Sequence, residues 1–340
     1  MKAASTDTGI VTVTINELLI FFKKIKSTIK ARTPPIRAEL TTPSIDEVIK
    51  ILENRYKFRF LDNESDISSQ MQDVSVVVDW QANPPSMLLD FASQIKLWQF
   101  LCIGTERFDF DGWRQTPTSF ELCPSSTSGH ALGEAAIMMA LMLLRRTNES
   151  RLSVEKRRLS YPPGEELSGK CLLLYGFGAS GKALAALVKP FGVKVRAIDV
   201  RPVPESELAE VGIFDPVYSP DRLHEMAAWC DILSIHVPVT QDTENSINTK
   251  VFEKMKPGSY LINVSRGAIL DEEALLNALN SGILAGAALD VVKSEPIDPS
   301  NPILSHPNVV MTPHVAVNTR HVAIRRAEAL RTNLIKYGLY

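Results

Sequence analysis

Three side chains that could carry out proton and anion chemistry follow the ends of predicted strands. Arg266 comes after LINVS, Glu295 after ALDVV and His314 after VVMTP. An arginine offers a bidentate fork to a planar carboxylate, and a histidine is the acid best matched to neutral pH. A carboxylate bonded to that histidine would fix its ring and stabilise its protonated form. Taken singly, the three residues are also compatible with a surface arginine, a solvated carboxylate and an ordinary loop histidine.

A glycine-rich loop interrupts the stretch LLLYGFGASGKALA, which begins at Leu172. An apolar predicted strand precedes the glycines and a predicted helix follows them. In a dinucleotide-binding loop, Gly176 allows the tight turn, Gly178 lets the backbone approach the pyrophosphate, and Gly181 lets the helix pack closely on the strand. Asp199 ends the next predicted strand, where a carboxylate binds the adenosine ribose and repels the 2′-phosphate of NADP. The pattern therefore favours an NAD site, and its alternative is a purely structural turn.

Alternating strands and helices must position these residues. After the glycine loop, the segments VKVRAIDV, DILSIHV, SYLINVS, AGAALDV and NVVMTP read as strands, with helices expected at about 219–229, 248–256 and 271–281. This alternation predicts an α/β fold with a doubly wound parallel sheet of the Rossmann type. Ligands of such sheets bind at the carboxyl ends of the strands. The arginine, the glutamate and the histidine would then share an edge with the dinucleotide, which indicates hydride transfer to a 2-oxo acid.

A first, shorter series of the same kind precedes a boundary near residues 124–130. Its predicted strands are IRAEL, KFRFL, VSVVVDW, LWQFLCI and SFELC. Helices are expected from Ser44 and in PSMLLDFASQI, with Pro85 near its start. The last segment, 318–340, is predicted to be a helix that packs back on this first domain. Residues 1–34 show no signal-peptide pattern, and we expect them to be an appended or poorly ordered extension.

The order of these motifs resembles that of the D-isomer-specific 2-hydroxyacid dehydrogenases. The resemblance covers about residues 70–337 and rests on the glycine loop, Asp199, HVPVT, INVSRG, GAALDV followed by EP, and TPH. It implies a smaller flavodoxin-like substrate domain formed by 35–124 and 315–340, and an NAD-binding domain formed by 125–314. It also implies a homodimer in which the helix SGHALGEAAIMMALMLLRR often contributes to the interface.

The resemblance assigns a role to each motif. It implies that Arg266 binds and polarises the substrate, that Glu295 is the partner of the histidine, and that His314 donates and accepts the proton. Backbone groups of Ile103 and Gly104 would receive the substrate carboxylate. The cofactor residues that it implies are Gly176, Gly178, Ala179, Ser180, Gly181, Asp199, Val237, Pro238, Val264 and Asp290. Many members carry an arginine and an aliphatic residue at the positions of Ala179 and Ser180, so here the Ser180 hydroxyl and backbone N–H groups are expected to hold the pyrophosphate.

The function predicted from these patterns is an NAD-dependent reductase of small 2-oxo acids, with glyoxylate or hydroxypyruvate as leading candidates. The alternative is a non-enzymatic, NAD-sensing binding protein similar to the corepressors that share this architecture and retain the Arg–Glu–His set. No peptide-binding groove is recognisable in residues 36–123. A third possibility is a member that kept the fold and lost the activity through altered substrate loops.

Composition restricts the remaining classes of function. The chain has 340 residues, of which 45% are hydrophobic and 22% charged, with a formal net charge of −2. This balance is typical of a globular protein, and it argues against a broad surface for nucleic acid or membrane. No stretch reaches the ~18 uncharged apolar residues of a membrane helix. The four cysteines form no CxxC pair, so we expect reduced thiols, a cytoplasmic protein and no metal site.

Overall fold

The computed structural model describes residues 10–14, 52, 57–61, 68, 71, 74–79, 86–102, 104, 108, 110–213 and 215–339. The chain divides into two compact units. One comprises Met1–Thr127 and Asn318–Tyr340, and the other comprises Ser128–Val317.

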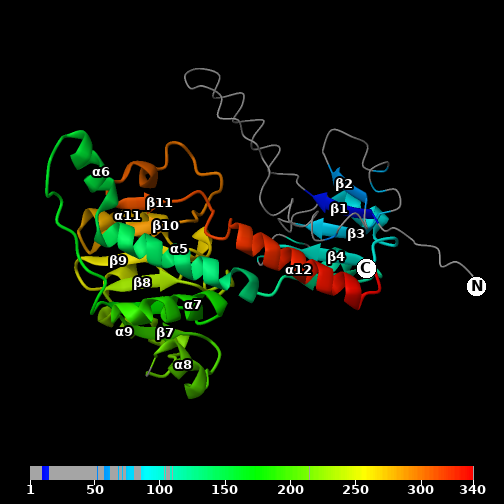
Figure 1. Ribbon diagram of the computed structural model, residues 1–340. Helices are drawn as coiled ribbons and strands as arrows, with labels where there is room; N and C mark the ends of the chain where they lie inside the picture. Colours follow the sequence, from blue (N-terminus) through cyan, green and yellow to red (C-terminus); the bar gives the residue numbers. More distant parts are fainter. Residues whose placement is uncertain are drawn as a thin grey trace, which may run out of the picture. The chain divides into compact units, whose positions relative to one another are not determined.

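The larger unit, Ser128–Val317, contains a six-stranded parallel sheet (Figure 1). Its strands are β6 (Cys171–Tyr175), β7 (Lys194–Ile198), β8 (Ile232–Ile235), β9 (Ser259–Asn263), β10 (Leu284–Leu289) and β11 (Val309–Met311). Their spatial order is β11-β10-β9-β8-β6-β7. The chain runs outward from β6 to β7 and returns on the other side of β6 as β8, which creates a topological switch point between β6 and β8. Such a point is where open α/β sheets bind ligands.

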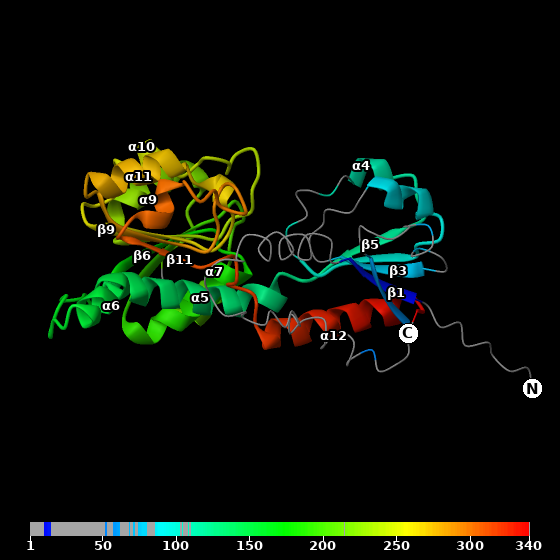
Figure 2. The ribbon, with the colours of Figure 1, turned by 90° about the horizontal axis from the view of Figure 1, so that it is seen from above.

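Helices cover both faces of this sheet, as the doubly wound fold requires. Figure 2 shows α9 (Leu223–Trp229), α10 (Thr249–Phe252) and α11 (Glu272–Asn280) on one face, with α5 (Ser126–Leu144), α6 (Thr147–Glu155) and α7 (Ala179–Val188) on the other. A further short helix, α8 (Glu205–Val211), follows β7. Every residue of β8 and β9 is buried, because a sheet covered on both faces needs continuous apolar strands. The predicted Rossmann-type sheet is therefore confirmed.

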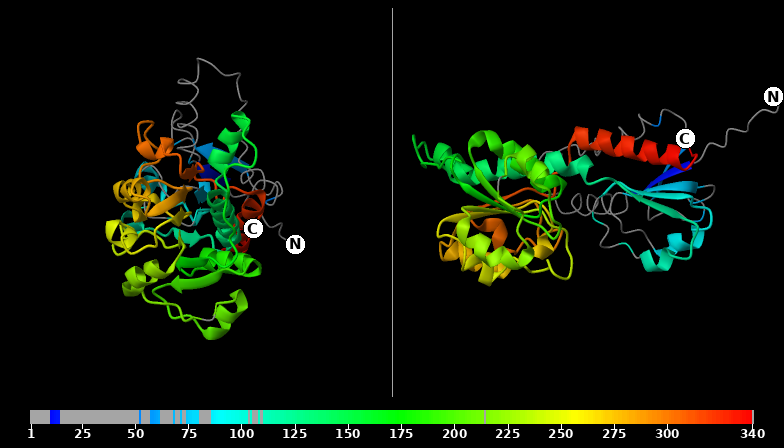
Figure 3. Two further views of the ribbon diagram at one scale, coloured as in Figure 1. Left: turned by 90° about the vertical axis from the view of Figure 1, so that its left-hand side faces the viewer. Right: turned by 90° about the horizontal axis from the view of Figure 1, so that it is seen from below.

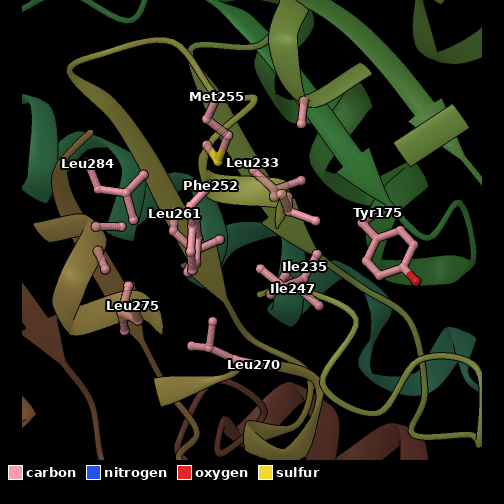
Figure 4. Packing of buried hydrophobic residues seen from close by; sticks show 14 of the residues in the cluster. Tyr175, Leu233, Ile235, Ile247, Phe252, Met255, Leu261, Leu270, Leu275 and Leu284 are labelled. Atoms are coloured by element: carbon pink, nitrogen blue, oxygen red, sulfur yellow. The ribbon is translucent and has the colours of Figure 1, made fainter. Parts of the chain in front are cut away.

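The core beneath α9, α10 and α11 is made of branched aliphatic and aromatic side chains (Figure 4). Leu233 and Leu261 project from the sheet, and Phe252 and Leu275 meet them from the helices. On the other face, α5 is long and apolar enough to cross a membrane by length and composition alone. However, 61% of its most apolar stretch is buried in the protein, as in a core helix.

The smaller unit contains a five-stranded parallel sheet in the order β2-β1-β3-β4-β5. Its strands are β1 (Ile10–Thr14), β2 (Lys57–Leu61), β3 (Val74–Asp79), β4 (Leu97–Phe100) and β5 (Ser119–Leu122), and the short helix α4 (Phe110–Trp113) precedes β5. This order is the flavodoxin-like one, as the resemblance implied. The C-terminal helix α12 (Arg320–Lys336) lies against this sheet (Figure 3), where Ala327, Leu330 and Leu334 pack in one cluster with Val76 and Val78.

Two expectations about the smaller unit need correction. Residues 1–34 were expected to be an appended extension, but Ile10–Thr14 forms the strand between β2 and β3, so this part of the segment belongs to the sheet. The sequence of that strand, IVTVT, consists of β-branched residues, which favour strands. The helix expected after Pro85 is the 3₁₀ helix Ser86–Phe91. The predicted strand IRAEL and, apart from Leu52, the helix predicted from Ser44 lie outside the described residues.

Candidate active site

The glycine-rich loop joins β6 to α7 through two close backbone approaches. Gly176 has a φ of 109°, and a Cβ there would lie 2.6 Å from the carbonyl carbon of His236. A Cβ on Gly181 would lie 2.2 Å from the carbonyl oxygen of Gly176. A Cβ on Gly178, by contrast, would meet no atom of the described residues within 4 Å, its chain neighbours aside. Gly176 and Gly181 therefore let the loop pack against neighbouring backbone that a larger residue would clash with, whereas Gly178 faces open space.

The first turn of α7 is suited to an anion. Gly178 is the N-cap and supplies no side-chain bond to the helix, and Ala179 and Ser180 are the first two helical residues. The leading N–H groups of a helix lack intrahelical acceptors and carry a partial positive charge. Together with the open position at Gly178, this geometry fits the pyrophosphate of a dinucleotide.

The Asp199 side chain, which follows the end of β7, forms a hydrogen bond with the backbone of the glycine loop. Its Oδ2 accepts from the Phe177 N–H at 2.8 Å, and its Oδ1 accepts from the Arg201 N–H at 2.9 Å. The Arg201 guanidinium lies 3.6 Å from Oδ1 and also donates to the Phe177 carbonyl at 3.2 Å. Each carboxylate oxygen has more than one lone pair, so Asp199 retains acceptor capacity for ribose hydroxyls.

The predicted backbone contacts Val237, Pro238 and Val264 lie at the carboxyl ends of β8 and β9. β8 is the neighbour of β6, and β9 follows β8 in the sheet. The Ser265 hydroxyl donates to the Val237 carbonyl, which connects the ends of β8 and β9. The Thr243 hydroxyl donates to the Pro238 carbonyl at 2.7 Å. These backbone segments therefore lie at the same edge of the sheet as the glycine loop.

Arg266 sits on a turn that two neighbours hold in place. The side chain of Asn263 accepts from the Ser265 N–H at 3.0 Å and donates to the Arg266 carbonyl at 3.0 Å. A Cβ on Gly267 would lie 1.9 Å from the carbonyl carbon of Val292, so only glycine lets this turn approach the segment after β10. That segment carries Glu295.

Glu295 and His314 form a hydrogen-bonded pair. His314 Nδ1 lies 2.8 Å from Glu295 Oε2, and the side chains are 45% and 31% exposed respectively. The other oxygen, Oε1, accepts from the Val292 N–H at 3.2 Å. Burial raises the pKa of Glu295, but the hydrogen bond and charge of His314, the Val292 N–H and the charge of Arg266 outweigh it, so the pKa is lowered. Glu295 is therefore ionised at neutral pH, with Arg266 close enough to contribute.

Asp290 holds the loop that carries His314. The Asp290 carboxylate accepts from the Thr312 hydroxyl at 2.5 Å and from the N–H groups of Val315 and Ala316 at 2.9 and 3.0 Å. Its carbonyl accepts from the His314 N–H at 2.9 Å. His314 adopts a φ of 53°, a strained value for a non-glycine residue that persists only where surrounding bonds impose it. These bonds fix the direction of the His314 ring.

The structure brings Arg266, Glu295 and His314 to the same edge of the sheet as the glycine loop. The predicted substrate loop belongs to the smaller unit, where the Gly104 carbonyl accepts from the Cys102 thiol at 3.2 Å, and Ile103 lies outside the described residues. The supporting roles of Asn263 and Gly267 were missed. Asn263 had a signal, a polar residue at the end of an apolar strand, whereas nothing local marked the approach of Gly267 to Val292.

Comparison with known proteins agrees with this geometry. The family model of the D-isomer specific 2-hydroxyacid dehydrogenase NAD-binding domain matches residues 137–316. The chain is 33% identical over 264 residues to a glyoxylate reductase of Thermofilum pendens, covering 73% of each chain. It is 28% identical over 304 residues to a 2-ketogluconate reductase of Gluconobacter oxydans, covering 86% of this chain and 94% of that one.

A solved structure described as the pyruvate reductase of Chlamydomonas reinhardtii has the same fold, with a TM-score of 0.77, 24% identity, and 99% and 98% of the two chains covered. The matches favour an oxidoreductase over a corepressor-like binding protein, and NAD as the cofactor. The chain belongs to the D-isomer-specific 2-hydroxyacid dehydrogenase family and is an NAD-dependent 2-hydroxyacid oxidoreductase.

Proposed function

We propose that Arg266, Glu295 and His314 are the catalytic residues of this dehydrogenase and that it reduces small 2-oxo acids such as glyoxylate or hydroxypyruvate. The observation that carries the proposal is the 2.8 Å bond between His314 Nδ1 and Glu295 Oε2, at the sheet edge that bears the dinucleotide loop. Arg266 lies close enough to act on Glu295 electrostatically.

The geometry assigns a task to each atom. Because Nδ1 of His314 faces the ionised Glu295, Nε2 is the nitrogen left to face the substrate. The glycine loop would hold NADH, which would supply the hydride in the reduction direction. The Nε2–H of protonated His314 donates its proton to the carbonyl oxygen, and in the oxidation direction neutral Nε2 accepts it. The guanidinium of Arg266 binds the substrate carboxylate and orients the carbonyl.

The proposed substrate class is inferred from the names of two relatives and from the presence of Arg266. The names glyoxylate reductase and 2-ketogluconate reductase both describe acids with a carbonyl next to the carboxylate. The test is the rate of NADH oxidation with glyoxylate, hydroxypyruvate, pyruvate and 2-ketogluconate. Turnover of glyoxylate or hydroxypyruvate supports the proposal. An absence of turnover on all four, in protein that binds NADH, would refute it.

We also propose a preference for NADH over NADPH. Asp199 presents a carboxylate where the 2′-phosphate of NADPH would lie, and such a charge repels the phosphate. Arg201 is already paired with that carboxylate. The test is kcat/KM with each cofactor, run in parallel with Asp199→Ala. A higher value with NADPH in the unaltered protein would contradict the preference.

A homodimer is proposed from the exposed apolar side chains of α5, α6 and the segment that follows. Leu152, Val154 and Leu159 are 40%, 75% and 92% exposed, and Met138 and Tyr161 are exposed as well. Clustered apolar exposure marks an interaction surface. Sedimentation should show a dimer that Leu159→Asp weakens, while Leu304→Asp, at an apolar residue 45% exposed elsewhere, leaves it intact. A monomeric unaltered protein would exclude the dimer.

A cytoplasmic location is proposed from the cysteines. Cys102, Cys123, Cys171 and Cys230 are all free thiols. Burial raises the pKa of Cys123 to about 11 and of Cys230 to about 12, so both are unreactive. Free thiols are typical of a reducing compartment. Fluorescence microscopy of the tagged protein tests the location, and a signal confined to an organelle or to the exterior would contradict it.

A further inference from the structure

Three polar side chains form a hydrogen-bonded series from the interior of β8 to the glycine loop. Nε2 of His236 lies 2.9 Å from the Ser234 hydroxyl, and Nδ1 lies 3.1 Å from the Ser180 hydroxyl. Ser234 is fully buried within β8, and Ser180 is the second residue of α7. The series therefore ends at the helix terminus that fits the pyrophosphate.

The direction of these bonds follows from the requirement that buried hydroxyls donate. Burial lowers the pKa of His236 to about 4, so the ring is neutral at neutral pH and carries a single N–H. Among the described residues, His236 is the only hydrogen-bond partner of the Ser234 hydroxyl. A buried O–H without an acceptor is costly. Ser234 therefore donates to Nε2, the ring hydrogen sits on Nδ1, and Nδ1 donates to Ser180.

We propose that His236 is a positioning residue for the cofactor and that it frees the Ser180 hydroxyl to donate to the pyrophosphate. With Nδ1–H directed at its oxygen, Ser180 keeps its own hydrogen for an outside acceptor. The opposite tautomer would direct that hydrogen to the ring instead. This hydrogen-bonded series takes the place of the side-chain contact that an arginine would make in this loop. The proposal concerns cofactor binding alone and does not depend on which acid is reduced.

The tautomer is measured directly in the protein without cofactor. The protein is labelled with ¹⁵N-histidine, and the signals of His236 are assigned by their loss in His236→Asn. At neutral pH we expect a protonated Nδ1 and an unprotonated Nε2. A ring protonated at Nε2 would overturn the proposal, because Ser180 would then donate to the ring.

The consequence is measured as the dissociation constant of NADH by fluorescence titration. Ser180→Ala should weaken NADH binding about 10-fold, as expected for a lost bond to a charged group. His236→Ala should weaken it similarly, and the double variant no further, because both changes remove one contact. His236→Asn, whose amide N–H can replace Nδ1–H, should retain most of the affinity.

Two controls distinguish loss of the hydrogen-bonded series from a general loss of packing as the cause of weaker NADH binding. Ser259→Ala removes another buried serine, on β9, which bonds to the Ile283 carbonyl at 3.4 Å, and it should leave NADH affinity unchanged. The binding of adenosine, which lacks a pyrophosphate, should be equal in Ser180→Ala and the unaltered protein. Equal losses for adenosine and NADH in Ser180→Ala would overturn the proposal even if His236→Ala fails to fold. Additive losses in a folded double variant would overturn it as well.

Discussion

Replacing Glu295 by glutamine should slow reduction. Reduction requires a proton from His314, and the ionised Glu295 at 2.8 Å stabilises the protonated ring. The pKa of Glu295 is lowered, so its charge persists as the pH falls through the usual glutamate range, and the contribution of the carboxylate is lost only below that range. Glu295→Gln removes the charge and should lower kcat/KM at neutral pH.

The size of the effect follows from the geometry of the pair. At about 4 Å between charge centres, the attraction is about 1 kcal/mol in water and about 4 kcal/mol at an effective dielectric constant of 20. Because the side chains are 45% and 31% exposed, solvent screens the pair strongly. The lower part of that range, about 1–2 kcal/mol, corresponds to a loss of about 10-fold in kcat/KM.

The assay is the initial rate of 2-oxo acid reduction at neutral pH for the unaltered protein, Glu295→Gln and Glu225→Gln. Glu225 forms an exposed ion pair with Arg222 at the start of α9, so its variant controls for the loss of a glutamate charge. A kcat/KM in Glu295→Gln equal to that of the unaltered protein would refute the idea that the carboxylate assists His314.

Three further changes test the site. His314→Ala should lower kcat by about 10²–10⁴-fold while the dissociation constant of NADH stays within a factor of about two; equal losses in both would make the histidine structural. Arg266→Lys should raise KM about 10-fold because an ammonium lacks the fork, and unchanged steady-state kinetics would exclude its role. Gly267→Ala places a Cβ 1.9 Å from the Val292 carbonyl carbon and should lower the free energy of unfolding by about 1–3 kcal/mol; urea denaturation that matches the unaltered protein would show that the turn can move.

The parts of the site that the sequence could predict are those whose signal is local. The glycine loop lies between an apolar strand and a helix, and Asp199 ends the next strand. Arg266, Glu295 and His314 each follow a strand, and parallel strands bring their carboxyl ends to one edge. Local order along the chain was therefore enough to place these residues together.

The parts that the sequence could not predict depend on contacts between distant segments. β1 takes its place in the sheet by pairing with β2 and β3, and IVTVT alone does not show those partners. Asp290 was expected among the cofactor residues, and no local pattern indicated that its carboxylate also holds the His314 loop. The bond between His236 and Ser180 joins residues 56 positions apart, which no spacing rule indicates.

The stereochemistry of the product tests the central claim most directly. The chain belongs to a family specific for D-isomers, and the proposed site would direct the hydride to one face of the carbonyl carbon and the His314 proton to the carbonyl oxygen. With hydroxypyruvate and NADH, chiral chromatography should detect D-glycerate as the only glycerate formed. L-Glycerate, a mixture of the two, or no glycerate from protein that binds NADH would contradict the account.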